Sequence, residues 1–200
     1  MELGKHYIWA VMIALVLSCG ENKKPLEVEI IETSANGNKL AAVAMDEVVE
    51  PNAQIRILPN EKYQTITGFG GSFTEASAHL LNRMGADNRR KILEAYFGEN
   101  GARYSLTRTH INSCDFSLGN YAYANVPDDV NLEHFSIDED RDDLVPMIKE
   151  AMSISKDGFK IIASPWTAPP WMKDNNDWRG GKLLPEYRST WALYFSKYVE

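Results

Sequence analysis

The sequence has little cysteine, little histidine and no concentration of positive charge. Its 200 residues include two cysteines, four histidines, and 21 lysines and arginines against 28 aspartates and glutamates, which gives a formal net charge of -7. An acidic chain without a Lys/Arg cluster is unsuited to nucleic acid, so we exclude that class of partner. No group of histidines, cysteines and carboxylates has the spacing of metal ligands, so we expect neither a metal nor an organic cofactor.

Long hydrophobic runs are also scarce, and the clearest one lies near the N-terminus. It extends from Tyr7 to Leu17, is too short to span a bilayer as a stable helix, and leads into Ser18-Cys19-Gly20. This pattern resembles the bacterial lipobox, so we predict a lipoprotein signal peptide over residues 1–18 and a lipidated Cys19 with a tether to residue 26. The chain is then exported and lipid-anchored to a bacterial membrane, at the cell surface or in the periplasm. One alternative is an ordinary signal peptide with a stray cysteine. Another is a buried N-terminal helix, but the polar stretch 21–25 that follows argues against the helix.

The second cysteine, Cys114, is left alone once Cys19 carries a lipid. Two cysteines in an exported chain otherwise raise the question of a disulfide. We therefore predict no disulfide and a buried Cys114 thiol.

About 180 residues remain after the leader, enough for one ordinary domain with a sizeable core. A complete (β/α)8 barrel needs roughly 250 residues, with a lower limit near 200. Residues 27–62 contain three extended runs, Val28–Thr33, Leu40–Met45 and Gln54–Ile57, separated by Asn, Gly and Pro. This pattern predicts strands and hairpins of a small all-β unit.

From Tyr63 onward, strand and helix patterns alternate, which is typical of a parallel sheet with right-handed crossovers. An open doubly wound sheet and a barrel both fit this alternation. A dinucleotide loop at 68–71 is rejected, because the spacing is not G-x-G-x-x-G and the acidic residue required further on is missing. The predicted strands are Tyr63–Thr67, Arg103–Ile111 and Phe159–Ala163, and the first two predicted helices are Glu75–Met84 and Asp87–Phe97. A third helix is predicted to begin at a capping box of Ser136 and Glu139 and to carry the apolar residues Leu144, Ile148 and Ala151. A fourth helix is predicted near the C-terminus, with an aromatic face that forms core: Tyr187, Trp191, Tyr194, Phe195 and Tyr198.

Unusual side chains follow two of these strands, at the ends where barrel active sites lie. Arg108 and Asp115 accompany the second strand, and the loop after the third presents Trp166 and Trp171. A carboxylate grips vicinal hydroxyls with charge-assisted hydrogen bonds, and an indole covers the apolar face of a sugar ring. Singly, Asp115 is explained as a turn cap, Arg108 as half of an ion pair and Trp166 as a filler of the barrel mouth. Together they favour a sugar site.

Four motifs resemble glycoside hydrolase family 30, the family of glucosylceramidase and its bacterial relatives. They are ITGFGGSFTEA at 66–76, SCDFS at 113–117, YANVPDD at 123–129 and ASPWTAPPWMK at 163–173. The resemblance implies an α/β fold, a (β/α)8 TIM barrel with an attached β-sandwich. Residues 63–200 would form the first three βα units of the catalytic barrel and the helix leading to strand four, and residues 27–62 would supply strands of the sandwich.

The resemblance also implies roles for single residues. The family's glucose-binding aspartate matches Asp115, its sugar-contacting tryptophan matches Trp166, and its active-site arginine near the nucleophile matches Arg108. His110 lies where the family pattern varies, and we expect it to be a structural residue whose ring nitrogens are paired.

The family is retaining and uses two glutamates about 5 Å apart, a protonated acid and an ionised nucleophile. The acid follows the fourth strand in an Asn-Glu-Pro motif and the nucleophile lies further on. Glu75, Glu186 and Glu200 match neither motif, so both catalytic glutamates are expected beyond Glu200. We therefore expect this chain to be the N-terminal portion of a longer enzyme and to be inactive by itself.

The expected function is retaining hydrolysis of β-glucosides, as in a glucosylceramidase, with a β-linked glucoside, glycan or glycolipid as partner. Asp115 and Trp166 suit hexoses in general, so β-1,6-glucan, xylan, β-fucosides and β-galactosides stay open as substrates. A non-catalytic carbohydrate-binding surface lipoprotein also stays open. It requires a stable product of this length, which the exposed edge of an unclosed barrel disfavours.

Overall fold

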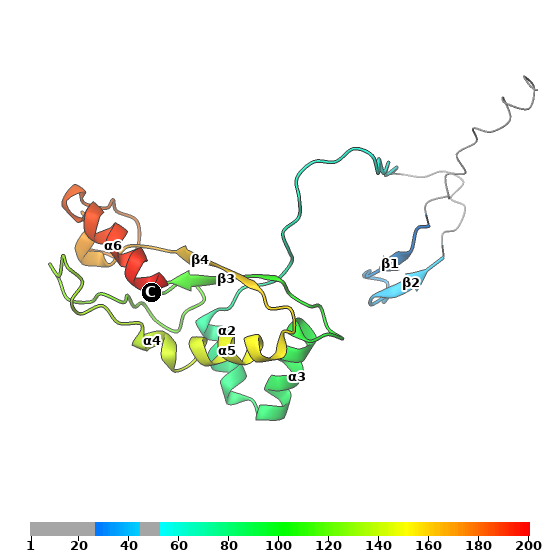
Figure 1. The fold of residues 1–200 in the computed structure, drawn as a ribbon, viewed down its shortest axis with the longest axis horizontal. Helices are drawn as coiled ribbons and strands as arrows, with labels where there is room; N and C mark the ends of the chain where they lie inside the picture. Colours follow the sequence, from blue (N-terminus) through cyan, green and yellow to red (C-terminus); the bar gives the residue numbers. More distant parts are fainter. Residues whose placement is uncertain (1–26, 45–52) are drawn as a thin grey trace, which may run out of the picture. The chain divides into compact units, whose positions relative to one another are not determined.

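The computed structural model describes residues 27–44 and 53–200 (Figure 1). The chain divides into two compact units, Met1–Lys62 and Tyr63–Glu200. The predicted signal peptide, the tether and Cys19 lie outside the described residues. Within the two described ranges, no helix is both long enough and apolar enough to cross a membrane.

The described part of the first unit forms one hairpin. β1 (Ile30–Glu32) pairs antiparallel with β2 (Ala41–Val43), and the turn between them uses Gly37 at φ 110°, which other residues rarely adopt. The third predicted strand, Gln54–Ile57, is wrong. This segment pairs with no strand among the described residues, and Ile55 is 90% exposed, because no neighbouring edge is available to it. The described part of the first unit therefore forms one two-stranded sheet, β1 and β2, and does not show the expected sandwich.

The second unit is built around a parallel sheet. β3 (Leu106–Ile111) pairs in parallel with β4 (Lys160–Pro165), with Arg108 opposite Ile162. The second and third predicted strands are thereby confirmed. The two carboxyl ends point the same way, so the residues that follow each strand meet at one end of the sheet.

The first predicted strand of this unit, Tyr63–Thr67, is misplaced by several residues. The segment that runs parallel to β3 is instead 69–73. The Arg108 N–H donates to the Gly71 carbonyl (3.1 Å), and the Phe73 N–H donates to the Arg108 carbonyl (2.8 Å).

Two glycines explain this shift. A Cβ on Gly70 would lie 1.7 Å from the Leu106 carbonyl oxygen, and one on Gly68 would lie 2.5 Å from the Ser105 hydroxyl oxygen. Only glycine allows the backbone to approach β3 this closely. The glycine-rich motif is therefore a strand contact.

Helices pack together on one side of this sheet, below β3 and β4 in Figure 1. A reciprocal capping box of Thr74 and Ser77 starts α2 (Glu75–Arg83), and α3 (Ala86–Phe97) ends at Gly98. Both match the predicted helices. Together with α5 (Leu144–Ile154) they enclose a core of Phe73, Ala78, Leu93, Phe97, Leu144, Met147 and Ala151.

The single helix predicted after Ser136 is wrong in two respects. The Ser136 hydroxyl accepts from the Asp138 N–H (3.1 Å) and forms no capping box with Glu139. The helix is also broken, into α4 (Asp138–Arg141) and α5. Pro146 explains the break, because in a continuous helix it could not donate to the Asp142 carbonyl and its ring would clash there.

α6 (Arg188–Val199) follows the short turns η1 (Pro170–Met172) and η2 (Pro185–Tyr187). Its Tyr194 is fully buried and Trp191, Phe195 and Tyr198 pack around it, so the predicted aromatic face is confirmed as core. This second core packs the loops after β3 and β4 against α6. Its buried members are Ile111, Tyr121, Tyr123, Ala124, Leu132, Ala168, Met172 and Tyr194.

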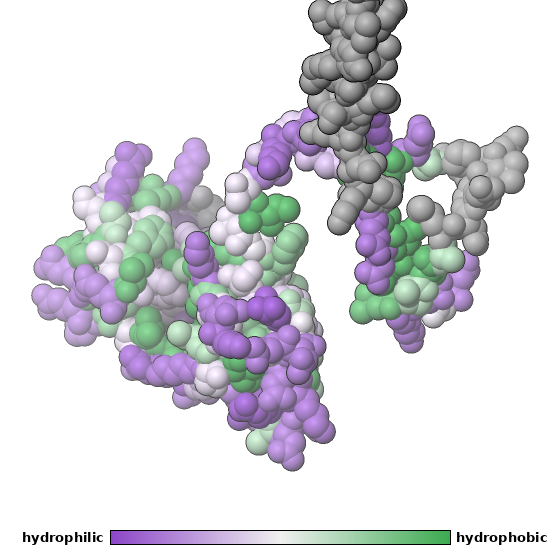
Figure 2. All heavy atoms as spheres, turned by 45° about the vertical axis from the view of Figure 1, so that its right-hand side comes forward, coloured by the Kyte–Doolittle hydropathy of each residue, from purple (hydrophilic) through white to green (hydrophobic). Residues whose placement is uncertain are grey.

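β4 forms an edge of the described sheet. Ile161 and Ile162 are 40% and 52% exposed, although strands of parallel sheets are usually covered on both faces. Figure 2 shows hydrophobic side chains among polar ones on the surface of this unit. The described residues thus leave apolar strand surface uncovered.

Candidate active site

Asn112 directly follows β3 and directs the chain towards Asp115. Its φ of 64° is left-handed, which asparagine tolerates better than most residues. The buried Asn112 amide donates to the Thr167 carbonyl beyond β4 (2.9 Å). Its side-chain oxygen accepts from the Tyr194 hydroxyl and from the Tyr123 N–H (3.3 Å). One side chain therefore ties the ends of β3 and β4 to α6.

Asp115 lies at the tip of a tight turn. The Cys114 N–H donates to the Ser117 hydroxyl (3.0 Å), and the Ser117 N–H donates back to the Cys114 carbonyl (3.1 Å). The turn rests on the N-terminus of α2, where the Ala76 N–H donates to the Phe116 carbonyl (2.9 Å). Since Cys114 and Ser117 close the turn, the Asp115 carboxylate is not needed as its cap, and it is exposed.

The Cys114 thiol is partly exposed, so the prediction of a buried thiol is wrong. Its sulfur accepts from the Phe116 N–H (3.4 Å). The tight turn puts this side chain in a pocket wall beside Asp115, away from both cores.

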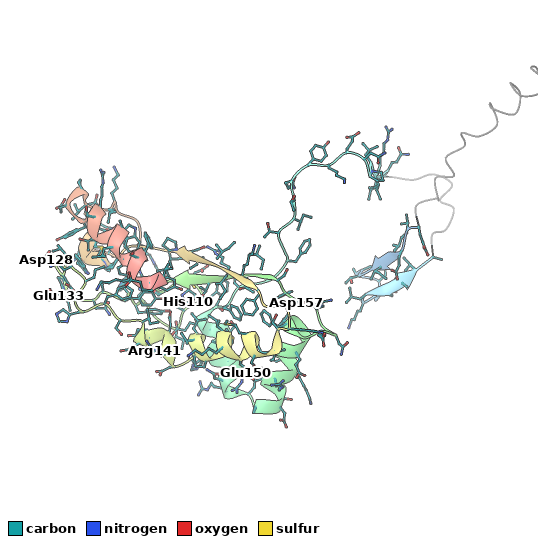
Figure 3. The ribbon with its side chains drawn as sticks, in the orientation of Figure 1. His110, Asp128, Glu133, Arg141, Glu150 and Asp157 are labelled. Atoms are coloured by element: carbon teal, nitrogen blue, oxygen red, sulfur yellow. The ribbon has the colours of Figure 1, made fainter. Side chains whose placement is uncertain are left out.

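His110 is a buried structural residue on β3, inside the unit in Figure 3. Its Nδ1 bonds to the Asn112 carbonyl (2.7 Å), and its Nε2 bonds to the Glu75 N–H (3.3 Å). Because the carbonyl only accepts and the amide only donates, the ring is neutral with its proton on Nδ1. The expectation that His110 is paired and structural is confirmed.

A buried carboxylate supports the loop that carries Asp115. Asp140 in α4 is 4% exposed and accepts from the Tyr121 and Tyr123 hydroxyls (2.7 and 2.6 Å). Burial raises the pKa of Asp140 and outweighs the lowering by these two hydrogen bonds. Burial, followed by the charge of Asp140, also raises the pKa of each tyrosine. The Tyr121 carbonyl accepts from the Ser113 N–H (3.1 Å), which links this cluster to the turn.

Arg108, within β3, stacks on Trp166, which directly follows β4. The guanidinium carbon lies 4.5 Å from the indole centroid, within the range of a cation–π contact, and Nε donates to the Ser164 hydroxyl (3.0 Å). Arg108 forms no ion pair with a carboxylate in the ranges that the structure describes. Trp166 is 44% exposed among the described residues.

The three predicted sugar-binding residues meet in one pocket. Arg108, Asp115 and Trp166 line a cavity of about 300 Å³. Asp115 and Trp166 also line an adjoining pocket of about 630 Å³, which Arg108 does not reach. No cluster able to hold a metal occurs among residues 27–44 and 53–200. The structure brings the three residues together, and their binding of sugar stays a prediction.

Trp171 does not join them. Its Nε1 donates to the Ala124 carbonyl (3.0 Å), and its ring meets Tyr187 edge-on at 4.9 Å. The prediction that the loop after β4 presents two indoles is therefore wrong for Trp171, whose ring packs against the second core.

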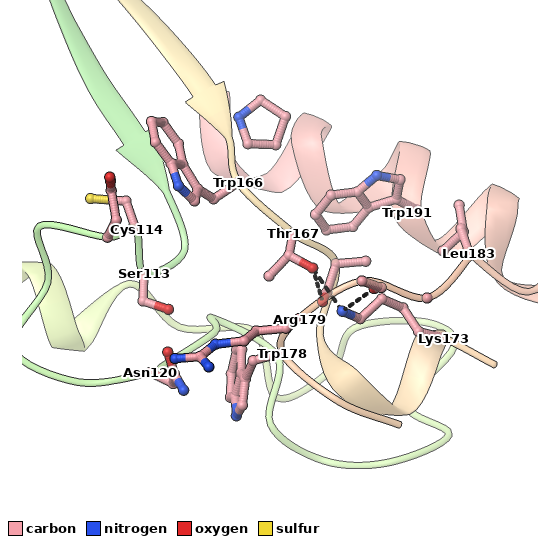
Figure 4. Close-up of a pocket in the computed structure, with 15 residues that line it drawn as sticks. Ser113, Cys114, Asn120, Trp166, Thr167, Lys173, Trp178, Arg179, Leu183 and Trp191 are labelled. Atoms are coloured by element: carbon pink, nitrogen blue, oxygen red, sulfur yellow. Dashed lines mark hydrogen bonds between the residues drawn. The ribbon is translucent and has the colours of Figure 1, made fainter. Parts of the chain in front are cut away.

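The larger pocket also contains residues that no sequence motif indicated (Figure 4). Trp178 and Arg179 come from the loop after η1, and Asn120 comes from the loop after β3. A large aromatic residue within the Asn-, Asp- and Gly-rich stretch 174–181 was the available signal for Trp178. No local sequence signal indicated the role of Asp140, because its partners Tyr121 and Tyr123 lie in a different segment.

Known proteins are similar to this chain in sequence and in structure. The glycosyl hydrolase family 30 TIM-barrel domain matches residues 66–200. Lysosomal acid glucosylceramidase of Mus musculus is 36% identical over 152 residues, which cover 73% of this chain and 30% of that relative.

Two solved structures are similar as well. SrfJ from Salmonella typhimurium has a TM-score of 0.68 and 38% identity, over 79% of this chain and 36% of its own. The endo-β1,6-glucanase BT3312 has a TM-score of 0.67 and 31% identity, over 81% of this chain and 36% of its own.

The chain spans about a third of the length of each of these proteins. The family match covers most of the chain and includes all four motifs, and the similar structures support a partial (β/α)8 barrel. The chain belongs to glycosyl hydrolase family 30.

Proposed function

We propose that the complete protein is a retaining glycoside hydrolase that acts on β-linked glucosides, and that Arg108, Asp115 and Trp166 hold the glucose unit. One observation carries this proposal. Arg108 lies within β3, Asp115 follows β3, and Trp166 follows the parallel neighbour β4. The three residues line one pocket, and Asp115 and Trp166 lie beyond the carboxyl ends of the strands, where barrel enzymes bind substrate.

The chemistry of the pocket suits a sugar. The exposed Asp115 carboxylate can accept hydrogen bonds from two neighbouring hydroxyls. Arg108 covers one face of Trp166, which leaves the rest of the indole for the apolar face of a pyranose. The guanidinium, free of a carboxylate among the described residues, raises the positive potential near the oxygens of the bound sugar.

The names of the relatives agree on glucose and differ in what it is linked to. One is a glucosylceramidase and another is an endo-β1,6-glucanase. A glucosylceramidase-like activity is our first candidate. Activity on β-1,6-glucan is the second, and it is favoured by the larger pocket beside Trp166.

None of the glutamates in this chain is proposed to be the catalytic acid or the nucleophile. Glu75 in α2 accepts from the Leu118 N–H (3.0 Å) and supports the Asp115 turn, and Glu186 lies in η2. A pair of carboxylates about 5 Å apart is what a retaining mechanism requires. The 200-residue chain alone is therefore expected to release no glucose.

We also propose that the protein is exported and lipid-anchored through Cys19. The support is the sequence Leu17-Ser18-Cys19-Gly20 after an apolar run. Metabolic labelling with a tagged fatty acid should mark the wild type and spare Cys19→Ser, which should leave the membrane fraction. Equal labelling of both would reject the anchor.

Enzyme assays on the complete protein test the proposed function. Wild type, Asp115→Asn and the surface control Asp138→Asn are compared on an aryl β-glucoside, on glucosylceramide and on β-1,6-glucan. Loss of charge-assisted hydrogen bonds costs about 1.5–3 kcal/mol, so kcat/KM of Asp115→Asn should fall about 10- to 100-fold. Asp138→Asn should match the wild type. A wild type inactive on all three would leave only sugar binding as the function.

A further inference from the structure

The loop 174–182 is held closed by its own hydrogen bonds. The Asp174 N–H donates to the Lys182 carbonyl (3.0 Å), and the Lys182 N–H donates to the Asp174 carboxylate (2.9 Å). The Asn175 amide donates to the Arg179 carbonyl (2.7 Å). Gly181 has φ 74°, and a Cβ there would lie 2.2 Å from the Asn175 side-chain oxygen, so this shape needs glycine. The loop thus has a defined shape without a ligand.

Lys173 fastens this loop to the end of β4. It is 6% exposed, and its Nζ donates to the Thr167 hydroxyl (2.9 Å) and to the Gly180 carbonyl (3.1 Å). Both acceptors are neutral. An ammonium has three N–H groups, so one donor remains on a side chain that lines the larger pocket.

The tip of the loop presents an indole and a guanidinium to the same pocket. Trp178 is partly buried and Arg179 is exposed. In Figure 4 the Arg179 guanidinium points toward Asn120, next to Trp178, and Trp166 lies across the pocket. Arg179 is in no ion pair within the described ranges. Its donors are therefore available to a ligand.

We propose that Trp178 and Arg179 form a second sugar subsite, next to the one of Asp115 and Trp166. Such a subsite favours the second candidate above, a glycan of two or more sugar units, over a glycolipid with a single sugar. This inference rests on the proposed function and specifies its substrate class. Trp178 stacks on the second ring, and Arg179 donates to its hydroxyls or to a carboxylate on it.

Polarity favours a sugar over a lipid in this place. The donors that line the larger pocket are Lys173, Arg179 and Asn120, and an acyl chain would desolvate these groups without pairing them. A hydroxylated ring pairs them. The shared Asp115 and Trp166 make the two pockets adjoin, as linked sugars require.

The test compares a substrate that reaches the second subsite with one that does not. β-1,6-linked glucose oligosaccharides reach it, whereas β-glucosyl fluoride has a leaving group too small to do so. The complete protein is assayed as wild type, Trp178→Ala, Trp178→Phe, Arg179→Gln and Arg141→Gln, the last being an exposed arginine outside the pocket as matched control.

For the oligosaccharides, kcat/KM should fall about tenfold or more in Trp178→Ala and Arg179→Gln, and Trp178→Phe should recover most of the loss. With β-glucosyl fluoride all variants should stay within about twofold of the wild type. Equal losses on both substrates would mean that the loop is only structural and would overturn the proposal. So would unchanged oligosaccharide kinetics, or a wild type that cleaves glucosylceramide and no oligosaccharide.

A wild type that cleaves nothing would refute the proposed function but not yet the subsite. Calorimetric titration with the same oligosaccharides then decides. Binding that weakens about tenfold in Trp178→Ala and not in Arg141→Gln sustains the subsite. Absent binding, or equal binding in all variants, overturns it.

Discussion

Buried polar side chains position the exposed ones in this site. Asn112 and Asp140 contact neither pocket, yet together they bond to both loops that carry the candidate sugar-binding residues. Each is paired through its side-chain polar atoms, as burial demands. The position of Asp115 thus depends on a side chain remote from it in sequence, Asp140, which acts through Tyr121 and Tyr123.

The stability of the protein should depend on pH through Asp140. Burial raises the pKa of this carboxyl in the folded state above the value of about 3.9 for an unfolded aspartate. The folded state therefore binds the proton more tightly, and the stability from this group is complete below about pH 4 and is lost as pH rises through the folded pKa. Urea unfolding at increasing pH should show wild-type stability falling relative to Asp140→Asn.

The neighbouring exposed Asp142 supplies the control for this experiment. Asp142→Asn should keep the wild-type pH dependence. Wild-type stability that rises with pH relative to Asp140→Asn, or that follows the same pH curve, would contradict the role assigned to the buried carboxyl.

At the residue scale, the chemistry of a side chain can be predicted from the sequence, but the direction in which that side chain points cannot. Arg108, Asp115 and Trp166 meet as expected because parallel strand ends converge. Trp171 looked equivalent to Trp166, but its N–H is taken up by the Ala124 carbonyl, a contact between segments 47 residues apart. Such a pairing has no local signal.

Among the elements, the contact of 69–73 with β3 depends on glycine. We expect Gly70→Ala to destabilise the protein by more than about 3 kcal/mol, because the added Cβ would lie 1.7 Å from the Leu106 carbonyl oxygen and must force the strands apart. Chemical denaturation measures the loss. Gly119→Ala is the matched control, since a Cβ there meets nothing within 4 Å, and it should change stability by less than about 1 kcal/mol. Similar stability of the two variants would mean that the close contact is relaxed at little cost.

Most helices and strands could be predicted, and each failure has a physical cause. α2, α3 and α6 carry caps or periodic apolar residues that act within a few residues. The helix after Ser136 breaks because Pro146 lies inside its pattern, and Tyr63–Thr67 fails as a strand because the close approach of Gly70 sets the pairing further along. Pairing partners of a strand are distant in sequence, so local patterns do not fix where a strand pairs.

For the molecule as a whole, buried tyrosines should make alkaline unfolding cooperative. Burial and the charge of Asp140 raise the pKa of Tyr198 to about 12, and burial also raises the pKa of Tyr194. An unfolded tyrosine ionises near pH 10, so the stability from these groups is present below about pH 10 and is lost as pH rises toward 12.

Tyrosinate absorbance and far-ultraviolet circular dichroism should therefore change together in this window. Tyr198→Phe removes one of the ionising groups, so it should shift the transition to higher pH and reduce its absorbance amplitude. Full ionisation of the tyrosines with the fold intact would contradict the burial of this cluster.

The complete protein's first sugar product tests the retaining mechanism most directly. Proton NMR during early hydrolysis of an aryl β-glucoside distinguishes the two anomers of glucose before they interconvert. Retention through a glycosyl-enzyme predicts that β-glucose appears first and α-glucose only later, at the rate of spontaneous mutarotation. α-Glucose appearing first, or no glucose release at all, would contradict a retaining β-glucosidase built on Arg108, Asp115 and Trp166.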